Sequence, residues 1–277
     1  MELELRDPQA LYRQWEGGQW DPWQMDLSND AASWSGLVQG DRDLILWALS
    51  SLLVAEERIT TQFSSLVMAY DSEEEETFLT TQQVDEARHL QFYNRYQDEI
   101  VADPGTIAEH VARARERLSD PFRTVFDEGL VAAHERLARD PRDRAAKVEF
   151  VTTYHLVIEG TLGVTAFNFI TRYLEGRGLL PGFVDGYSRI ARDEQRHLAY
   201  GVWYLRDAVG SDPALGDSVR TTLRRLLPAV ADSLTPPQRN GGTDWDALGT
   251  SAAEVREFAL GGLARRLDVV GVPLATL

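Results

Sequence analysis

Two nearly identical pentapeptides, DEARH at residues 85–89 and DEQRH at residues 193–197, decide how this sequence is interpreted. Each falls inside a stretch of helical periodicity, and each places a Glu and a His three residues apart. Residues at i and i+3 lie on one face of a helix, so the carboxylate and the imidazole can hold the same ion. One Glu-x-x-His is a weak signal because it often arises by chance, but two near-duplicates favour a shared function. The pairs are Glu86 with His89 and Glu194 with His197.

Two more glutamates lie where apolar residues are expected. In four-helix bundles, two Glu-x-x-His helices and one Glu from each of the other two helices build a site for two metal ions. Glu56 falls on the apolar stripe that contains Leu49 and Ile59, and Glu159 interrupts the apolar run 156–164. A carboxylate in such surroundings is costly unless it is paired or bound to metal. We therefore predict six metal ligands: Glu56, Glu86, His89, Glu159, Glu194 and His197.

The predicted ligand set also indicates the kind of metal. Carboxylates with only two imidazoles suit iron or manganese better than structural zinc. Two such ions held between helices can activate dioxygen, because together they supply several electrons without a protein thiol. Asp85 and Asp193 stand beside ligand positions, where carboxylates commonly orient a ligating His. The alternative for both is an ordinary surface ion pair with Arg88 or Arg196.

The remaining three histidines are weaker candidates. His110 and His134 lie among charged residues, and we expect them to be solvated. His155 lies one helical turn before Glu159. It is expected to be a core histidine with satisfied hydrogen bonds, and the alternative is a partner of the ligands.

Helical periodicity and helix-start signals run through nearly the whole chain, and no useful strand-like alternation appears. Residues 1–35, rich in Trp and Asp, are expected to be an irregular arm, and 234–243 are the clearest linker. At 72–75 and 106–109, Ser-x-x-Glu and Thr-x-x-Glu indicate capping boxes. Helices are expected at about 41–69, 72–100, 106–139, 140–178, 181–210, from 211–213 onward, and at 245–267.

These elements predict an all-α fold: a helical bundle with four ligand-bearing core helices plus additional helices. We expect a single domain over 1–277. Its parts are the arm 1–35, the metal-binding bundle core 36–210 and accessory C-terminal helices 211–277.

Composition excludes several functions. The chain has 277 residues, 44 acidic against 28 basic side chains, a formal net charge of −16 and no cysteine. Without cysteine there is no disulfide framework, zinc finger, iron–sulfur cluster or thiol nucleophile. The negative charge argues against binding of nucleic acid or anionic membranes as the main task. The charged N-terminus and the lack of any run of 18 apolar residues predict a cytoplasmic protein without stable membrane insertion.

The ligand order Glu, Glu-x-x-His, Glu, Glu-x-x-His resembles the ribonucleotide-reductase small-subunit group of the ferritin-like superfamily. Within that group, the chain most resembles the small-subunit-like ligand-binding oxidases. The resemblance runs from LYRQW at 11–15 and QWDP at 19–22 to about Ala208, and it is weakest beyond 210. It implies a ferritin-like bundle, a manganese/iron or di-iron pair, dioxygen as oxidant, a hydrophobic tunnel for a long-chain fatty acid, and a homodimer.

The resemblance also assigns roles to individual residues. It implies one ion, the manganese position, at Glu56, Glu86 and His89, and a second, the iron position, at Glu159, Glu194 and His197. Members of this subfamily form an ether cross-link between a Tyr five residues before the third Glu and a β-branched residue three after the first. Those positions are Tyr154 and Ile59 here. The family has Val where this chain has Ile59, and Ile keeps the tertiary Cβ–H that the reaction needs. The alternative for Tyr154 is a core tyrosine with a hydrogen-bonded hydroxyl.

Three other functions stay open. A ribonucleotide reductase small subunit is favoured by Tyr93, four residues after His89, where that family carries a radical tyrosine. It is opposed by the lack of any Tyr after Tyr204 that would relay an electron. A biosynthetic di-iron oxygenase acting on an amino acid or aryl amine would need a buried Arg or Lys near its substrate. An iron-storage bundle is disfavoured by the additional helices.

Overall fold

The computed structural model describes residues 5–233 and 249–277, and these residues form helices and no strand. The predicted linker 234–243 and the first residues of the predicted last helix lie outside the described residues. The elements are α1 (Pro8–Glu16), η1 (Pro22–Gln24), α2 (Ser28–Gly36), α3 (Gln39–Gln62), α4 (Ser64–Met68), α5 (Glu73–Glu99), α6 (Ile107–Arg115), α7 (Asp120–Arg123), η2 (Thr124–Leu130), α8 (Val131–Arg139), α9 (Arg144–Val151), η3 (Thr152–Gly163), α10 (Val164–Arg177), α11 (Pro181–Ser211), α12 (Leu215–Ser233), α13 (Ala252–Val270) and η4 (Leu274–Thr276).

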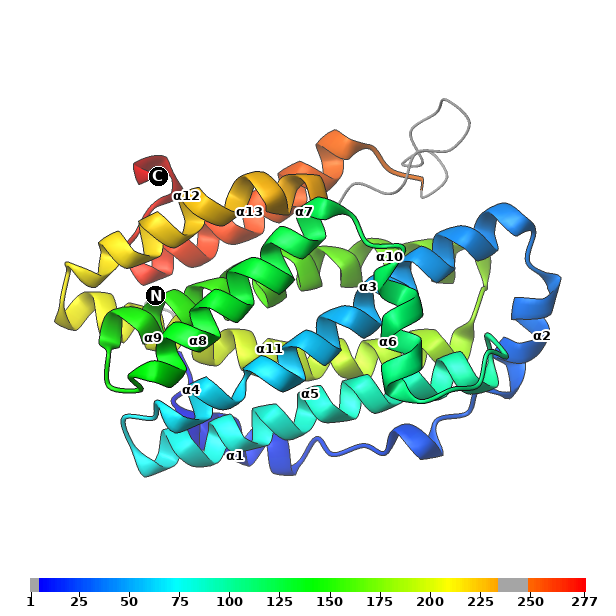
Figure 1. The fold of residues 1–277 in the computed structure, drawn as a ribbon, viewed down its shortest axis with the longest axis horizontal. Helices are drawn as coiled ribbons and strands as arrows, with labels where there is room; N and C mark the ends of the chain where they lie inside the picture. The colour runs from blue at the N-terminus through cyan, green and yellow to red at the C-terminus, as the bar shows by residue number, and fades with distance from the viewer. Residues whose placement is uncertain (1–4, 234–248) are drawn as a thin grey trace.

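Four long helical segments form the centre of the bundle: α3, α5, the continuous segment α9–η3–α10, and α11. They run along the long axis of the molecule (Figure 1). Helix α1 lies against α5, while α12 and α13 pack on η3. Gly201 on α11 permits one close approach, because a Cβ there would lie 2.2 Å from the Cβ of His155 on η3. The hydrophobic core lies between these four segments and extends to α12 and α13, where Leu223 and Leu263 are fully buried.

The segment η3 is a π-helix, which the sequence did not predict. Its wider turns let the Thr161 hydroxyl donate to the carbonyl of Leu156, five residues earlier, at 2.7 Å. π-Helical turns are rare and frequently occur at functional sites. This one contains three of the residues singled out above, Tyr154, His155 and Glu159.

Several predicted boundaries were wrong. The expected irregular arm contains helices in its described part, residues 5–35: Asp7 accepts a hydrogen bond from the Ala10 N–H, and Pro8 starts α1. The helix expected over 106–139 is interrupted after Arg115, and Ser119 caps a new start. Proline suits the first turn of a helix, so the Pro two residues after this cap was the signal to use.

One of the two predicted capping boxes is complete. At Thr106 and Glu109, each side chain accepts from the other's backbone N–H. Ser72 does cap α5, but Glu75 turns inward instead of returning to the Ser72 N–H. Its carboxylate accepts from Lys147 at 2.9 Å, and both side chains are buried. A buried lysine recruits this glutamate because an unpaired charge in the core is costly.

No helix among the described residues is both long enough and apolar enough to cross a membrane.

Candidate metal centre

The six predicted ligands converge at the middle of the bundle, and all are buried. Their donor atoms form two overlapping groups, each with atoms within 4.8 Å of one another. The groups are Glu56, Glu86, His89 and Glu194, and Glu86, Glu159, Glu194 and His197. Glu86 and Glu194 belong to both groups. The assignment of one ion to Glu56, Glu86 and His89 and of a second to Glu159, Glu194 and His197 stays a prediction.

Each histidine presents its Nδ1 atom to three carboxylates. The Nδ1 of His89 lies 3.4 Å from both Glu86 and Glu194. The Nδ1 of His197 lies 3.1 Å from both Glu86 and Glu159. One carboxylate oxygen of each of the four glutamates and the Nδ1 of His89 have no hydrogen-bond partner although they are buried. Buried polar atoms are almost always paired, so these orphaned donors fit a site for metal ions.

The aspartates of the two pentapeptides act across the bundle. Asp85 lies 3.2 Å from the Nε2 of His197, on the other helix, and Asp193 lies 3.4 Å from the Nε2 of His89. Because an ionised carboxylate only accepts, it keeps the proton on Nε2 and leaves Nδ1 free as a metal ligand. Both aspartates also accept from the buried Arg196, at 3.0 and 2.7 Å. Each aspartate therefore both orients a histidine and pairs with Arg196, and this ion pair lies in the core and not at the surface.

Two tryptophans of the N-terminal segment complete this arrangement. The indole N–H of Trp15 donates to Asp85 at 2.9 Å, and that of Trp20 donates to Asp193 at 2.6 Å. These contacts lie outside the bundle's own helices, so the helical spacing of the sequence gave no signal for them. They fix both carboxylates in place.

Charge in this cluster is balanced by protons when metal is absent. Burial alone would lower the pKa of His89 and His197, but the surrounding carboxylates raise both well above the ordinary value. Burial raises the pKa of Glu56 to about 8, against the opposing effect of His89. Burial and Glu194 also raise the pKa of Glu159. Metal ions would take the place of these protons.

The sequence pattern of the family described as "Ribonucleotide reductase, small chain" matches residues 2–228. The chain belongs to this family.

Solved structures share the fold over nearly the whole length. An R2-like ligand-binding oxidase with a valine-to-alanine substitution and an anaerobically reconstituted Mn/Fe cofactor has a TM-score of 0.82 and 22% identity, covering 96% of this chain and 94% of that chain. A tyrosine-to-phenylalanine variant with aerobically reconstituted cofactor has a TM-score of 0.80 and 22% identity, covering 95% and 93%. The predicted all-α, ferritin-like bundle is confirmed.

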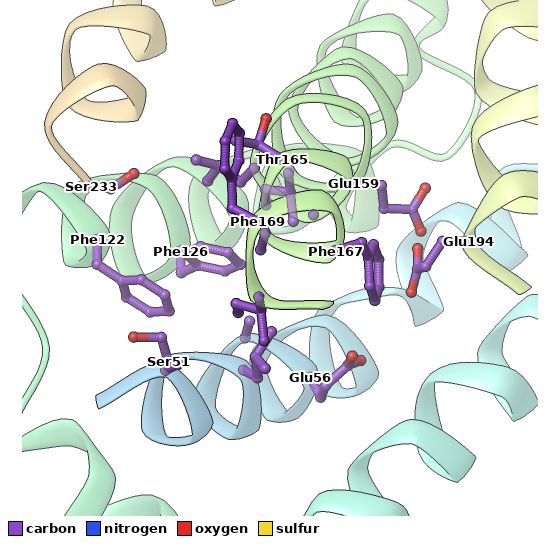
Figure 2. Close-up of a pocket in the computed structure, with 18 of the residues that line it drawn as sticks. Ser51, Glu56, Phe122, Phe126, Glu159, Thr165, Phe167, Phe169, Glu194 and Ser233 are labelled. Atoms are coloured by element: carbon purple, nitrogen blue, oxygen red, sulfur yellow. The ribbon is translucent and has the colours of Figure 1, made fainter. Parts of the chain in front are cut away.

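An apolar pocket adjoins the ligand cluster of this family member. Figure 2 shows Glu56, Glu159 and Glu194 at one end of the pocket and Phe122 and Ser233 at the other. Ile59 also contributes to its wall. Among the described residues that line it, the only ionisable side chains are the three glutamates, and none is Arg or Lys. A substrate recognised by a buried cation is therefore disfavoured.

Tyr154 and its surroundings lie beside the cluster. The Tyr154 hydroxyl donates to Glu86. The buried amide of Gln82 lies 3.1 Å from that hydroxyl, 3.2 Å from the Nε2 of His155 and 3.4 Å from Glu159. Gln82 was not singled out as functional, although it lies one turn before Glu86 on the same stripe. An amide side chain four residues before Glu86, on the same helical stripe, was the signal in the sequence that could have identified Gln82.

The expectation for the other histidines was partly wrong. His110 is buried, not solvated: its Nδ1 lies 2.8 Å from Asn94 Oδ1 and its Nε2 lies 2.7 Å from the carbonyl oxygen of Asp103. The charged residues beside His110 in the sequence suggested exposure, but its burial is decided by the residues that surround it in space. His134 is half-buried, with its Nδ1 2.7 Å from the carbonyl oxygen of Gln62. His155 is a core histidine that also touches the cluster through Gln82, but its Nδ1 has no hydrogen-bond partner, so the expectation of satisfied hydrogen bonds was wrong.

Replacing Asp193 with Asn is expected to weaken metal binding by roughly 10–100-fold, because the amide no longer fixes the proton on the Nε2 of His89. Asp185→Asn, in an exposed pair with Arg189 on the same helix, is the matched control. Competition with a chromophoric chelator measures both variants. Equal affinity in Asp193→Asn and wild type would contradict this role.

The metal-free protein is expected to lose stability as pH rises from about 6 to 9. Groups whose pKa is raised in the folded state stabilise it below their ordinary pKa, and this contribution is lost as pH passes the folded value. His89, His197 and Glu56 all act in this direction. Asp193 has a lowered pKa, caused by His89 and Arg196 against the effect of burial, so its contribution is already complete above about pH 5.

Metal should reverse that trend, since binding displaces protons and strengthens with pH. Thermal unfolding at several pH values measures both trends, with chelator for the metal-free protein and with added metal for the loaded protein. The expected result is a Tm that falls with pH in chelator and rises with pH in metal. Parallel curves would contradict the proton balance.

Proposed function

We propose that this protein is an oxygen-activating dimetal oxidoreductase that oxidises a C–H bond. The observation that carries the proposal is the cluster of orphaned, buried carboxylate oxygens and the Nδ1 of His89 at the inner end of an apolar pocket. We further propose all six predicted ligands as metal ligands, Glu86 and Glu194 being shared between the two ions. A manganese/iron or di-iron pair bound there supplies the electrons that reduce dioxygen.

The chain's own residues contribute position, exclusion of water and proton acceptors. The helices hold the six donors before metal arrives, since Arg196, Trp15 and Trp20 fix the aspartates behind both histidines. The aromatic wall of the pocket keeps water from the inner end. An apolar ligand is favoured, and we propose a long-chain fatty acid or a similar molecule as the occupant of the pocket.

We also propose the ether cross-link between Tyr154 and Ile59. The support is that the Tyr154 hydroxyl donates to Glu86, and that Phe63, one turn after Ile59, packs its ring 5.2 Å from that of Tyr154. The O–H bond of Tyr154 and the Cβ–H bond of Ile59 break, and an O–C bond forms. Two electrons and two protons go to dioxygen reduced at the metal pair.

Aerobic loading with iron(II), alone or with manganese(II), tests the proposal by intact-protein mass. We expect a loss of two hydrogen atoms in the wild type, and no loss in Tyr154→Phe or Ile59→Ala. Organic extraction of the purified protein and mass spectrometry test the apolar ligand. An unchanged mass at full metal occupancy would exclude the cross-link. Extraction of an amino acid or of an aryl amine, instead of an apolar molecule, would contradict the pocket assignment.

A second function is a ribonucleotide reductase small subunit, which generates a radical for a partner. Family membership and one observation favour it: Tyr93 is buried and its hydroxyl has no partner. A stable tyrosyl radical that disappears in Tyr93→Phe would support this function over the oxidase. The expected homodimer is proposed for either function, and light scattering tests it.

A further inference from the structure

A row of aromatic rings leads from the cluster to the half-buried Trp203. The ring of His155 lies 4.5 Å from that of Tyr154, whose hydroxyl contacts Glu86. The ring of Tyr200, on α11, lies 5.3 Å from His155, and that of Trp203 lies 6.0 Å from Tyr200. Tyr200 is fully buried, whereas Trp203 is half-buried and reaches the surface. Rings so close together transfer electrons rapidly compared with enzyme turnover.

The hydroxyl of Tyr200 has a proton acceptor of its own. It donates to Glu75 at 2.5 Å. That carboxylate is held by Lys147 at 2.9 Å, and the Lys147 ammonium also lies 2.7 Å from Asp71. A phenol gives up an electron readily only when its proton can leave at the same time. Glu75 lies on α5 about three helical turns before Glu86, and the Glu75–Lys147 pair has no part in the proposed oxidation.

Two other buried tyrosines, Tyr93 and Tyr187, lack this feature. The hydroxyls of Tyr187 and Tyr93 are buried and have no hydrogen-bond partner. Their oxidation would leave a proton with no acceptor in the core, which is costly. Proton acceptance thus distinguishes Tyr200 from Tyr93 and Tyr187. Tyr154 also donates to a carboxylate, but that carboxylate is the predicted metal ligand Glu86, whereas Glu75 is not a predicted ligand.

We infer that Tyr200 is a redox-active residue that donates one electron to the oxidised metal centre and its proton to Glu75, with Trp203 as the exit to the surface. The inference rests on the proposed function, because dioxygen reduced at that centre is the oxidant. The Tyr200 O–H bond breaks and its electron passes through His155 and Tyr154. Tyr200 becomes a neutral radical and Glu75 a carboxylic acid.

Trp203 then restores Tyr200. One electron moves from the indole to the tyrosyl radical, which recovers its proton from Glu75, and the indole proton leaves to solvent. The oxidised Trp203 is reduced by a small-molecule thiol or ascorbate in solution, or it reacts with dioxygen and gains oxygen atoms. When the pocket holds no oxidisable ligand, this route removes oxidising equivalents that would otherwise attack the ligands and their neighbours.

Freeze-quenched electron paramagnetic resonance after mixing the iron(II)-loaded protein with dioxygen tests the inference. The expected tyrosyl signal is absent in Tyr200→Phe, present in the control Tyr187→Phe, and longer-lived in Trp203→Phe, where the exit is removed. Peptide mass spectrometry should find added oxygen at Trp203 in the wild type, reduced at least tenfold in Tyr200→Phe. If Tyr200→Phe folds poorly, the lifetime of the signal in Trp203→Phe still tests the inference, because Trp203 is only half-buried and its replacement should be tolerated.

Three outcomes would overturn the inference: a signal that persists in Tyr200→Phe, a signal lost only in Tyr93→Phe, or added oxygen confined to Trp20 and unchanged by Tyr200→Phe. Metal content and dioxygen uptake are measured on the same samples. Full metal occupancy with dioxygen uptake but no signal dependent on Tyr200 overturns this inference alone. Full occupancy without dioxygen uptake overturns the proposed function as well.

Discussion

Replacing Glu86 with Ala is expected to leave the protein unable to hold either ion of the metal pair. Glu86 is one of the two carboxylates that belong to both donor groups, and it lies 3.4 Å from the Nδ1 of His89 and 3.1 Å from that of His197. Its removal takes a ligand from each position at once. Metal analysis after loading and desalting should find two ions per chain in the wild type and none in this variant.

Glu159→Ala tests the removal of a carboxylate that belongs to one donor group only, for comparison with Glu86, which belongs to both. Glu159 belongs to one group only, so this variant should keep one ion and lose the other. Glu57→Ala is the control, since Glu57 follows Glu56 in α3 but is part of neither group, and it should retain both ions. Two ions retained in Glu86→Ala, or in Glu159→Ala, would contradict the proposed ligand assignment.

Arg196→Met is expected to reduce the free energy of unfolding by about 3–5 kcal/mol, since it leaves buried carboxylates without their shared cation. Arg196 is 2% exposed, and its guanidinium bridges Asp85 and Asp193. Without it the two aspartates repel each other in the core, and Asp193 keeps only the indole of Trp20 as a strong donor, while Asp85 keeps Trp15 and Arg88. Metal affinity should fall together with stability.

Denaturant unfolding of the metal-free and metal-loaded protein measures this effect. Arg189→Met, in an exposed pair with Asp185 on the same helix, should change stability by at most about 1 kcal/mol. A loss of similar size in both variants would show that the Arg196 bridge is no stronger than a surface ion pair.

The ligand set was accessible from the sequence for local reasons. Glu-x-x-His places both side chains on one helix face whatever the tertiary structure. Glu56 and Glu159 stood out because a carboxylate on an apolar stripe needs a reason to be there. Both arguments use only helical spacing and the cost of burial, so they hold before any helix is placed beside another.

Features that depend on packing between helices were beyond such arguments. Each Asp orients the histidine of the opposite helix, and this pairing follows from how α5 and α11 cross. The burial of His110 depends on Asn94 and the carbonyl of Asp103, which local polarity concealed. The π-helix η3 also went unpredicted, because the spacing of apolar residues does not show which carbonyl each backbone N–H reaches.

Dioxygen uptake on adding iron(II), with or without manganese(II), to the metal-free protein tests the central claim most directly. An oxygen electrode should record rapid uptake of about one dioxygen per pair of ions bound. Uptake should be absent in Glu86→Ala and unchanged in Glu57→Ala. Two bound ions per wild-type chain without dioxygen uptake would contradict the assignment of this cluster as an oxygen-activating centre.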